Sequence, residues 1–506
     1  MTGHIEHTSV LCGLAHNPAL PTDLVDILVK DGDYGVLTDL VERADLTAAQ
    51  VGTLVERSHP TLIALLVQHG HLTPQPHHFD DPAAAIQLIY SGHGSPELSA
   101  RLAGCPEPEV RRELASSAAP LAEATLRALA EDADVPTVIA VAGWRELPDD
   151  VARALARHPD VEVRVDLASN PTETVPADVL AEFMASGGDA PILTCGACRN
   201  MPPDQRRCTD HVAGIDRIRA MALRNRVTPI GALLGSVAAE DASDRAALAE
   251  RADLPGNLLA ELAGDHVDFV RTAVAENPGT PVETLRILAG DHDVDVRRAV
   301  ANNPEVPLDL LFDLAPHTRL NLRAGIPRIE RATETELRGL ASSRTAQVRA
   351  LAASRSDLPG DLRAALAEDT DPGVAKLVAD HPSLSADDLR LLAARHGPRL
   401  YSSIARNPNC PSELLHTMAR NSQTVPKALR EIAQHPASEP RTLILCLADR
   451  EARSRAAANP ALPADALTAL LDEPNHSGTY AAAANPSLPV ETMRQHIGRG
   501  SAMAGG

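Results

Sequence analysis

Four residues near the middle of the chain have the types and spacing of a metal site. They are Cys195, Cys198, Cys208 and His211, in the pattern C-x2-C-x9-C-x2-H. Thiolate sulfur and imidazole nitrogen are the usual ligands of structural zinc, and each x2 pair can bind from one turn. Because four protein ligands leave no open position, we predict a structural zinc site. An iron–sulfur cluster is a less favoured alternative, and four buried reduced cysteine or histidine side chains without metal are another.

The same four residues allow a different interpretation, in which they form a cysteine-based redox sensor or a metal-dependent enzyme. Such a protein needs a low-pKa thiolate or an open ligand position. Arg199, Arg206 and Arg207 lie close in the sequence and would lower a thiol pKa. The sequence has no phosphate-binding loop, no G-x-S-x-G and no H-E-x-x-H motif. We therefore predict no catalytic residue and no enzymatic activity, and we keep the cysteine chemistry as the alternative.

The elements around this cluster follow a repeat of 26 residues. Between Asp265 and Ala315 one phrase occurs twice: Asn277-Pro278 becomes Asn303-Pro304, and Pro281 becomes Pro307. A period of this length with turn residues at fixed phase is typical of a repeat array.

Each unit of the array predicts two short helices. Proline in the first turn, with Thr280 as N-cap, begins one helix at Pro281, and Leu285 and Leu288 lie on one face of it. A second helix is expected from Val294 to Ala301, and the following Asn-Pro ends it. Its inner side is expected to carry Val296, Ala299 and Val300. Helices this short are unstable in isolation, so each unit must bury its apolar face against the next unit.

The spacing of the prolines that begin each unit divides the chain into regions of different regularity. We expect less regular repeats over residues 1–95, repeats over 96–194, a metal-binding unit at 195–211 and regular repeats over 212–497. Residues 498–506 read as a flexible tail or a remnant of cloning. The whole is about 19 two-helix repeats. In this register Cys195 and Cys198 end one helix, and Cys208 and His211 replace the leucine pair on a helix that begins near Pro203.

Composition limits the possible partners. The net charge of −21 argues against nucleic acid and anionic lipid, which need basic surfaces. No apolar stretch approaches the roughly 20 residues of a membrane span, and no signal peptide is evident. Seven cysteines, an odd number and mostly isolated, fit a reducing cytoplasm.

Histidines before proline and arginines after valine recur in the repeats, and we expect both to have structural roles. The histidines of the His-Pro sites are expected to be turn residues, because a ring nitrogen can bond backbone groups as an amide does. They are His59, His158, His381 and His435. The arginines of recurring Val-Arg pairs, such as Arg111 and Arg349, are expected to form an inter-repeat ladder of ion pairs with acids such as Glu109.

The phrase V-R-x-x-V-A-x-N-P-x-x-P-x-x-x-L-x-x-L-A, at Val296–Ala315 and Val270–Ala289, resembles the leucine-rich repeat variant family. The resemblance extends over nearly the whole chain and is strongest from about residue 203 to 495. It implies an all-α, right-handed, HEAT-like α-solenoid of alternating α- and 3₁₀-type helices. One member of that family carries an iron–sulfur cluster on clustered N-terminal cysteines, but here the N-terminal region has Cys12 only.

The sequence thus favours a non-enzymatic scaffold that binds a protein partner along an extended face of a solenoid. A HEAT-like glycosylase acting on DNA is disfavoured by the acidic charge.

Overall fold

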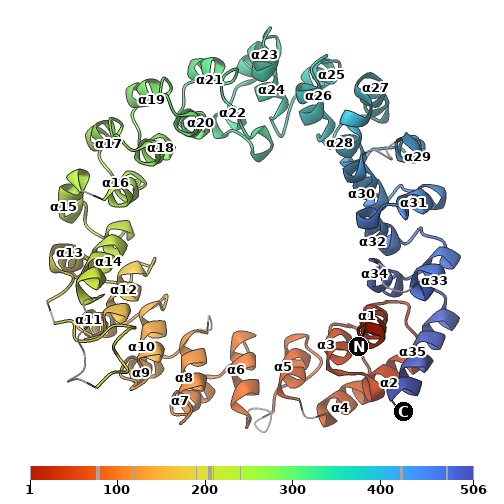
Figure 1. The fold of residues 1–506 in the computed structure, drawn as a ribbon, viewed down its shortest axis with the longest axis horizontal. Coiled ribbons are helices and arrows are strands. Elements are labelled where there is room, and N and C mark those ends of the chain that lie inside the picture. The colour runs from red at the N-terminus through yellow and green to blue at the C-terminus, as the bar shows by residue number, and fades with distance from the viewer. Residues whose placement is uncertain are drawn as a thin grey trace. The chain divides into compact units, whose positions relative to one another are not determined.

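The computed structural model describes residues 2–57, 59–75, 80–117, 121–189, 191–202, 208, 210–239, 241–421, 425–473 and 477–504. Within these residues all regular secondary structure is helical, and the one β-type contact is an isolated parallel bridge between Asp160 and Thr194. The predicted all-α helical repeat fold is confirmed (Figure 1).

The chain divides into two compact units, one of residues 1–73 with 321–506 and the other of residues 74–320. The helices of the first unit are α1 Thr2–Ala15, α2 Thr22–Asp31, α3 Tyr34–Val41, α4 Ala48–Glu56, α5 Pro60–Gln68, η4 Leu322–Ala324, α22 Pro327–Glu330, α23 Glu334–Ala341, α24 Ala346–Ala353, α25 Gly360–Ala367, α26 Pro372–Ala379, α27 Ala386–His396, η5 Gly397–Arg399, α28 Tyr401–Arg406, α29 Ser412–Asn421, α30 Pro426–Gln434, α31 Pro440–Cys446, α32 Arg450–Ala458, α33 Ala464–Asp472, α34 Thr479–Ala483 and α35 Val490–Ala504. Those of the second unit are α6 Pro82–Tyr90, α7 Pro96–Ala103, α8 Pro108–Ala115, α9 Glu123–Ala130, α10 Val135–Ala142, α11 Asp149–Ala156, α12 Val161–Ser169, α13 Ala177–Ser186, α14 Asp210–Arg224, α15 Ile230–Leu233, η3 Leu234–Ala238, α16 Ala242–Ala249, α17 Gly256–Leu262, α18 Asp268–Glu276, α19 Val282–Leu288, α20 Val294–Asn302 and α21 Leu308–Leu314.

A regular repeat has two helices, which we call A and B, and α19 and α20 are an example. Helix A begins after Pro281, which takes the N-cap position. Thr280 was expected to cap this helix, but its hydroxyl donates instead to the Val274 carbonyl at 2.5 Å. Helix B is capped by Asp293, whose side chain accepts from the N–H groups of Asp295 and Val296. The carboxylate satisfies two of the N–H groups that a helix start leaves free.

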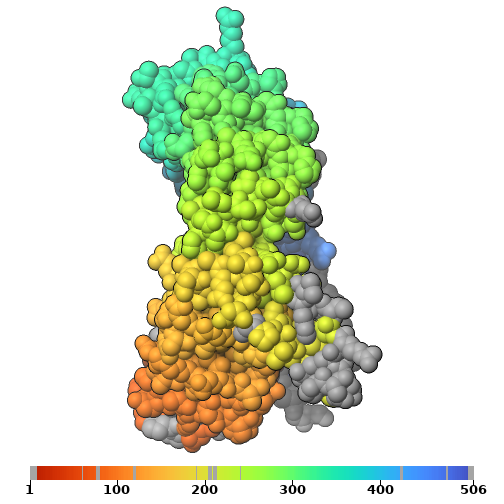
Figure 2. Space-filling model, turned by 90° about the vertical axis from the view of Figure 1, so that its left-hand side faces the viewer, coloured from red at the N-terminus to blue at the C-terminus, as the bar shows by residue number. Residues whose placement is uncertain are grey.

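The apolar faces of A and B make the core between repeats. Leu285 and Leu288 of α19 are 0% and 1% exposed, as predicted, and Val296, Ala299 and Val300 of α20 are buried. In the regular repeats the B helices pack on one another, as α18 packs on α16 and α20. Figure 2 shows the outer face of the second unit, where the repeats follow one another from orange through yellow to green.

Buried asparagines connect consecutive repeats, and we call them the asparagine row. The Asn277 side-chain N–H₂ group donates to the carbonyls of Ala249 at 2.6 Å and Arg251 at 2.8 Å, while its Oδ1 accepts from the Gly279 N–H. This uses both donors and the acceptor of the amide. Asn303 repeats the pattern on the carbonyls 28 and 26 residues earlier. Further members are Asn170, Asn225, Asn407, Asn459 and Asn485.

Histidine can take an asparagine position in this row. Nε2 of His435 donates to the Asn407 carbonyl at 3.0 Å, and Nδ1 accepts from the Ala437 N–H at 3.1 Å. His158 and His381 accept in the same way from the N–H groups two residues later. For these three histidines the predicted role as turn residues is confirmed.

A second set of contacts joins B helices through buried ion pairs. Arg271 pairs with Asp291 at 2.6 Å, and both side chains are less than a tenth exposed. Arg111 and Arg349 pair in the same way with Asp132 and Asp369 of the following repeat. The predicted ladder therefore exists at these positions. The acid lies about 20 residues after the arginine, and is not the upstream acid that the sequence indicated.

The C-terminal repeats depart from the regular pattern in two ways. In α31, after Pro440, Leu443 and Cys446 are the buried residues, whereas Ile444 is 46% exposed. Helix α31 takes Glu439 as its N-cap, which turns these two side chains inward. Helix α35 continues to Ala504, so residues 498–504, expected in a flexible tail, are helical.

Candidate metal centre

The metal candidate lies in a segment that connects the two helices of one repeat. Helix α13 is followed directly by α14 among the described residues, and Asn225 follows Asn170 in the asparagine row although 55 residues separate them. Among the described residues α13 and α14 therefore serve as the two helices of one repeat, and the helix predicted to begin near Pro203 falls on residues 203–207, which lie outside the described part of the chain. Helix α13 already supplies a buried apolar pair, Leu180 and Phe183, so the cysteines replace no missing apolar pair.

The secondary structure around the cysteines also differs from the prediction. Cys195 and Cys198 were expected at the end of a helix, but they lie in a turn at residues 195–200. In this turn the N–H groups of Cys198 and Arg199 donate to the Cys195 carbonyl at 3.0 and 2.9 Å. Cys208 was expected on a helix, but it precedes α14. Prolines on both sides of the turn, Pro191 and Pro202, break the helical pattern.

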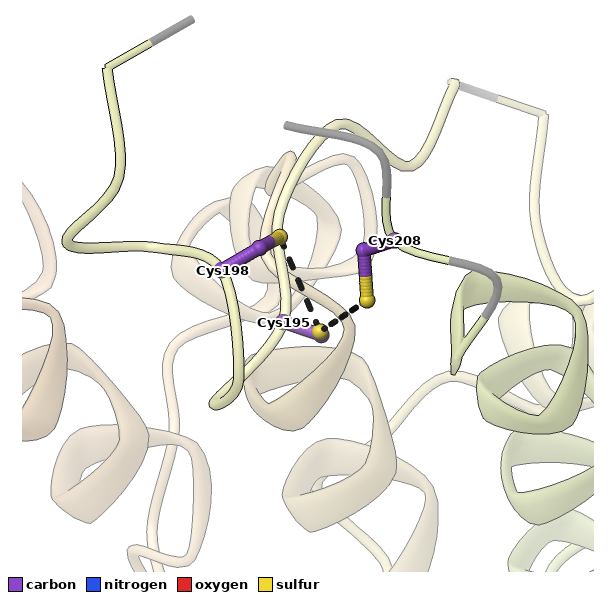
Figure 3. A group of neighbouring side chains, drawn as sticks. All are labelled: Cys195, Cys198 and Cys208. Atoms are coloured by element: carbon purple, nitrogen blue, oxygen red, sulfur yellow. Dashed lines mark hydrogen bonds between the residues drawn. The ribbon is translucent and has the colours of Figure 1, made fainter. Parts of the chain in front are cut away.

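Three of the four predicted ligands come together. The sulfur of Cys195 lies 3.7 Å from that of Cys198 and 3.4 Å from that of Cys208, and all three sulfurs are within 4.8 Å of one another (Figure 3). These distances exclude a disulfide bond of about 2.05 Å. Sulfurs bound to one tetrahedral zinc at about 2.3 Å would lie about 3.8 Å apart. The spacing of the three sulfurs therefore fits a shared metal ion.

The turn favours the thiolate form that a metal needs. Burial raises the pKa of Cys195, but hydrogen bonds from Cys208 and from the N–H groups of Ala197 and Cys198 outweigh it and hold that pKa below its ordinary value. By contrast, burial raises the pKa of Cys410 and of Cys446, which lie apart from this site, to about 12. These two thiols behave as ordinary small apolar side chains.

The fourth predicted ligand, His211, lies in the first turn of α14. Its side chain is outside the described residues, as are the side chains of residues 209, 210 and 212. Among the described side chains, the group of Cys195, Cys198 and Cys208 is the one set of three cysteine, histidine or acidic residues close enough to hold a metal ion.

A buried carboxylate holds the turn on helix α12. Asp160 is 1% exposed and caps α12 by accepting from the Glu162 N–H at 3.0 Å. It also accepts from the Thr194 hydroxyl and from the Arg199 guanidinium, each at 3.0 Å. The Val161 N–H donates to the Thr194 carbonyl at 3.0 Å. Residues on both sides of Cys195 are thus fixed to the start of one B helix.

Arg164 of α12 anchors the preceding part of the segment. Its side chain is fully buried and donates to the carbonyls of His158 at 2.8 Å, Pro191 at 3.3 Å and Gly187 at 3.4 Å. Burial lowers the pKa of this guanidinium. Two of these three carbonyls, those of Gly187 and Pro191, belong to the connecting segment.

Comparison with known proteins supports the repeat class. The model of the leucine rich repeat variant family matches residues 268–293, the span of α18 and α19, and confirms the resemblance in this part of the chain. The two-helix units are helical repeats. No curated protein matches the chain. No described helix is long and apolar enough to cross a membrane.

Two solved structures align along most of the chain. One is an engineered protein, 15% identical, with 94% of this chain and 98% of that chain covered and a TM-score of 0.15. The other, from a study of the Pds5–Scc1 complex and cohesin function, is 14% identical, with 89% and 69% covered and a TM-score of 0.18.

Proposed function

We propose that this protein is a non-enzymatic scaffold that binds a protein partner on the surface of its repeat array. The observation that carries the proposal is the stack of near-identical two-helix units, a form that creates extended binding surfaces. The net charge of −21 opposes nucleic acid or anionic membranes as the partner.

Exposed apolar side chains provide a test of the scaffold and of the face that binds. Ile287 on helix A is 71% exposed, and Phe269 on helix B is 48% exposed. Affinity capture with the full-length wild type, Ile287→Ser and Phe269→Ser would compare the two helix rows. We expect one variant to lose a protein that the wild type and the other variant retain. Capture of no specific protein by the wild type would contradict a scaffold role.

We further propose a structural zinc ion held by Cys195, Cys198, Cys208 and His211. The support is the distance of 3.4–3.7 Å from the Cys195 sulfur to the other two sulfurs and the N–H groups directed at Cys195. Thiolate is preferred by zinc and by iron–sulfur clusters, but a His₁Cys₃ set is a common zinc set. The ion would supply a link between the turn and the start of α14, and its binding energy would stabilise the folded segment.

Elemental analysis of the purified full-length protein tests the metal. We expect about one zinc per chain in the wild type and loss of it in Cys198→Ser. Cys446→Ser is the matched control, because Cys446 is equally buried and far from the cluster in sequence. Full zinc content in Cys198→Ser, or iron with inorganic sulfide in the wild type, would contradict the zinc assignment.

A cysteine-based redox sensor, or a metal-dependent enzyme using the same unit, is the alternative, and the lowered pKa of Cys195 is the observation that favours it. Cys195 and Cys198 are 2% and 1% exposed, however, whereas a sensor thiolate must meet its oxidant. Rapid alkylation of Cys195 without chelator would favour the sensor. Alkylation only after chelation would favour the structural ion.

A further inference from the structure

The first repeat of the chain packs against the last repeat, within the unit that contains both (Figure 1). Helix α1 lies beside α34, and α2 lies beside α35. Leu14 and Ala15 of α1 and Ala482 and Ala483 of α34 are all fully buried. A terminal repeat of a solenoid would otherwise expose such an apolar face and need a polar cap.

The hydrogen bonds at this contact follow the rule of the asparagine row. Asn485 donates to the carbonyls of Asn459, the previous member of the row, and of Ala457. Asn17 donates to the carbonyls of Asn485 at 2.7 Å and of Ala483 at 2.8 Å. Asn17 is 0% exposed and thus uses the last repeat as its preceding repeat.

Ion pairs between consecutive A helices give the same alignment of the first repeats on the last. Arg286 of α19 pairs with Asp309 in the first turn of the next A helix, at 2.9 Å. Arg494 of α35 pairs with Asp23 in the first turn of α2, at 3.3 Å. Asp309 and Asp23 both stand two residues after the proline N-cap of their helix. Two independent sets of side chains therefore align α1 as the B helix that follows α34 and α2 as the A helix that follows α35.

The backbones at this contact approach closely because α1 carries a glycine. A Cβ added to Gly13 would lie 2.5 Å from the Tyr480 carbonyl oxygen and 2.7 Å from the Ala483 Cβ. Gly52 of α4 has no atom within 4 Å of the corresponding point. Both glycines lie within helices, but atoms of a neighbouring helix occupy the Cβ position at Gly13 and none do so at Gly52.

We propose that the two ends of the chain recognise each other as consecutive repeats. The partner of the C-terminal face of α34 and α35 is the N-terminal repeat of the same chain, and each end serves as the cap of the other. The folding of α1 and of α34 is coupled across more than 460 residues of sequence. Neither the metal centre nor a bound partner takes part in this coupling.

Hydrogen exchange measured by mass spectrometry on the full-length protein tests the coupling. In Gly13→Leu we expect exchange of α34 amides to accelerate at least tenfold, whereas Gly52→Leu leaves α34 unchanged. Unchanged α34 exchange in Gly13→Leu would overturn the proposal.

A second pair of variants is less disruptive, and it distinguishes loss of the contact from unfolding of α1 itself. Asn17→Ala removes the two bonds to Ala483 of α34 and to Asn485, together with the local bond from the Ala19 N–H, and Asn407→Ala removes the three equivalent bonds inside the same unit. We expect Asn17→Ala to accelerate exchange in α34, and Asn407→Ala to act on α26 and α28. If the effect of Asn17→Ala stays within residues 2–41, the two ends fold separately and the proposal fails.

Discussion

The repeats from α16 to α20 and the region from α12 to α14 join their B helices differently. In the regular repeats an asparagine and a buried Arg–Asp pair connect each B helix to the next, as Asn277 and Arg271 do. Between α12 and α14 the asparagine contact persists through Asn225. Arg164, however, donates to the Gly187 and Pro191 carbonyls of a connecting segment that carries the cysteines. The comparison shows that the asparagine row tolerates an insertion, and that the insertion needs an attachment of its own.

Breaking the ion pair of the regular repeats should have the largest effect. Arg271→Leu leaves Asp291 buried without its partner and should cost about 3 kcal/mol of local stability. Hydrogen exchange of α18 and α20 amides measures this. Arg286→Leu is the control, since the pair of Arg286 with Asp309 is exposed and should matter much less. Equal effects of the two variants would contradict a role for burial.

The asparagine row should contribute equally in the two regions. Asn225→Ala and Asn277→Ala each remove bonds to two buried carbonyls and should each cost about 2 kcal/mol. Exchange rates of α14 and α18 amides give the two values. A much smaller cost for Asn225→Ala would mean that the insertion replaces the row at that point.

Removal of the metal should change hydrogen exchange in the connecting segment but not in the regular repeats. If zinc links the turn to α14, a chelator should accelerate exchange in residues 191–202 and at the start of α14, and leave α16 to α20 unchanged. Cys198→Ser should show the same pattern without chelator. An unchanged connecting segment after complete zinc removal would rule out a structural role for the ion.

The smallest expected effect is a pH dependence where the ends of the chain meet. Burial lowers the pKa of His16, but bonds to the Cys12 carbonyl and the Glu42 carboxylate, with Asp39 nearby, raise it overall. The Tyr480 hydroxyl faces Nδ1 of His16 from α34 at 3.0 Å. Because the folded-state pKa is raised, His16 stabilises this contact below the ordinary histidine pKa of about 6.5, and the gain is lost as pH rises through the raised value.

Protection factors of α1 amides in the wild type and in His16→Gln measure this dependence. The difference between the two proteins should be largest at low pH and shrink as the pH rises. A difference that is constant with pH would exclude titration of His16 as its cause.

The regular repeats could be predicted from sequence because their signals are local. The prolines, the buried pair Leu285 and Leu288, and the start of α20 at Val294 follow from helix periodicity and capping. At Pro203 a proline at the right spacing predicted a helix start, and that position lies outside the described residues; the segment before it is a turn, which the spacing of the prolines did not indicate. The asparagine contacts across repeats were missed, but their 26-residue spacing was a visible signal.

The contact between the first and last repeats was not predictable from the pattern. Every repeat offers the same pair of carbonyls, so the sequence does not specify which repeat Asn17 meets. The cysteine cluster, in contrast, was found from spacing, since an x2 pair fixes two sulfurs in one turn wherever the turn lies.

The most direct test of the metal centre is X-ray absorption at the zinc edge on the full-length protein as purified. The proposed site predicts three sulfur ligands at about 2.3 Å and one nitrogen ligand at about 2.0–2.1 Å. A spectrum with oxygen and nitrogen ligands only, or no zinc in the protein, would contradict it.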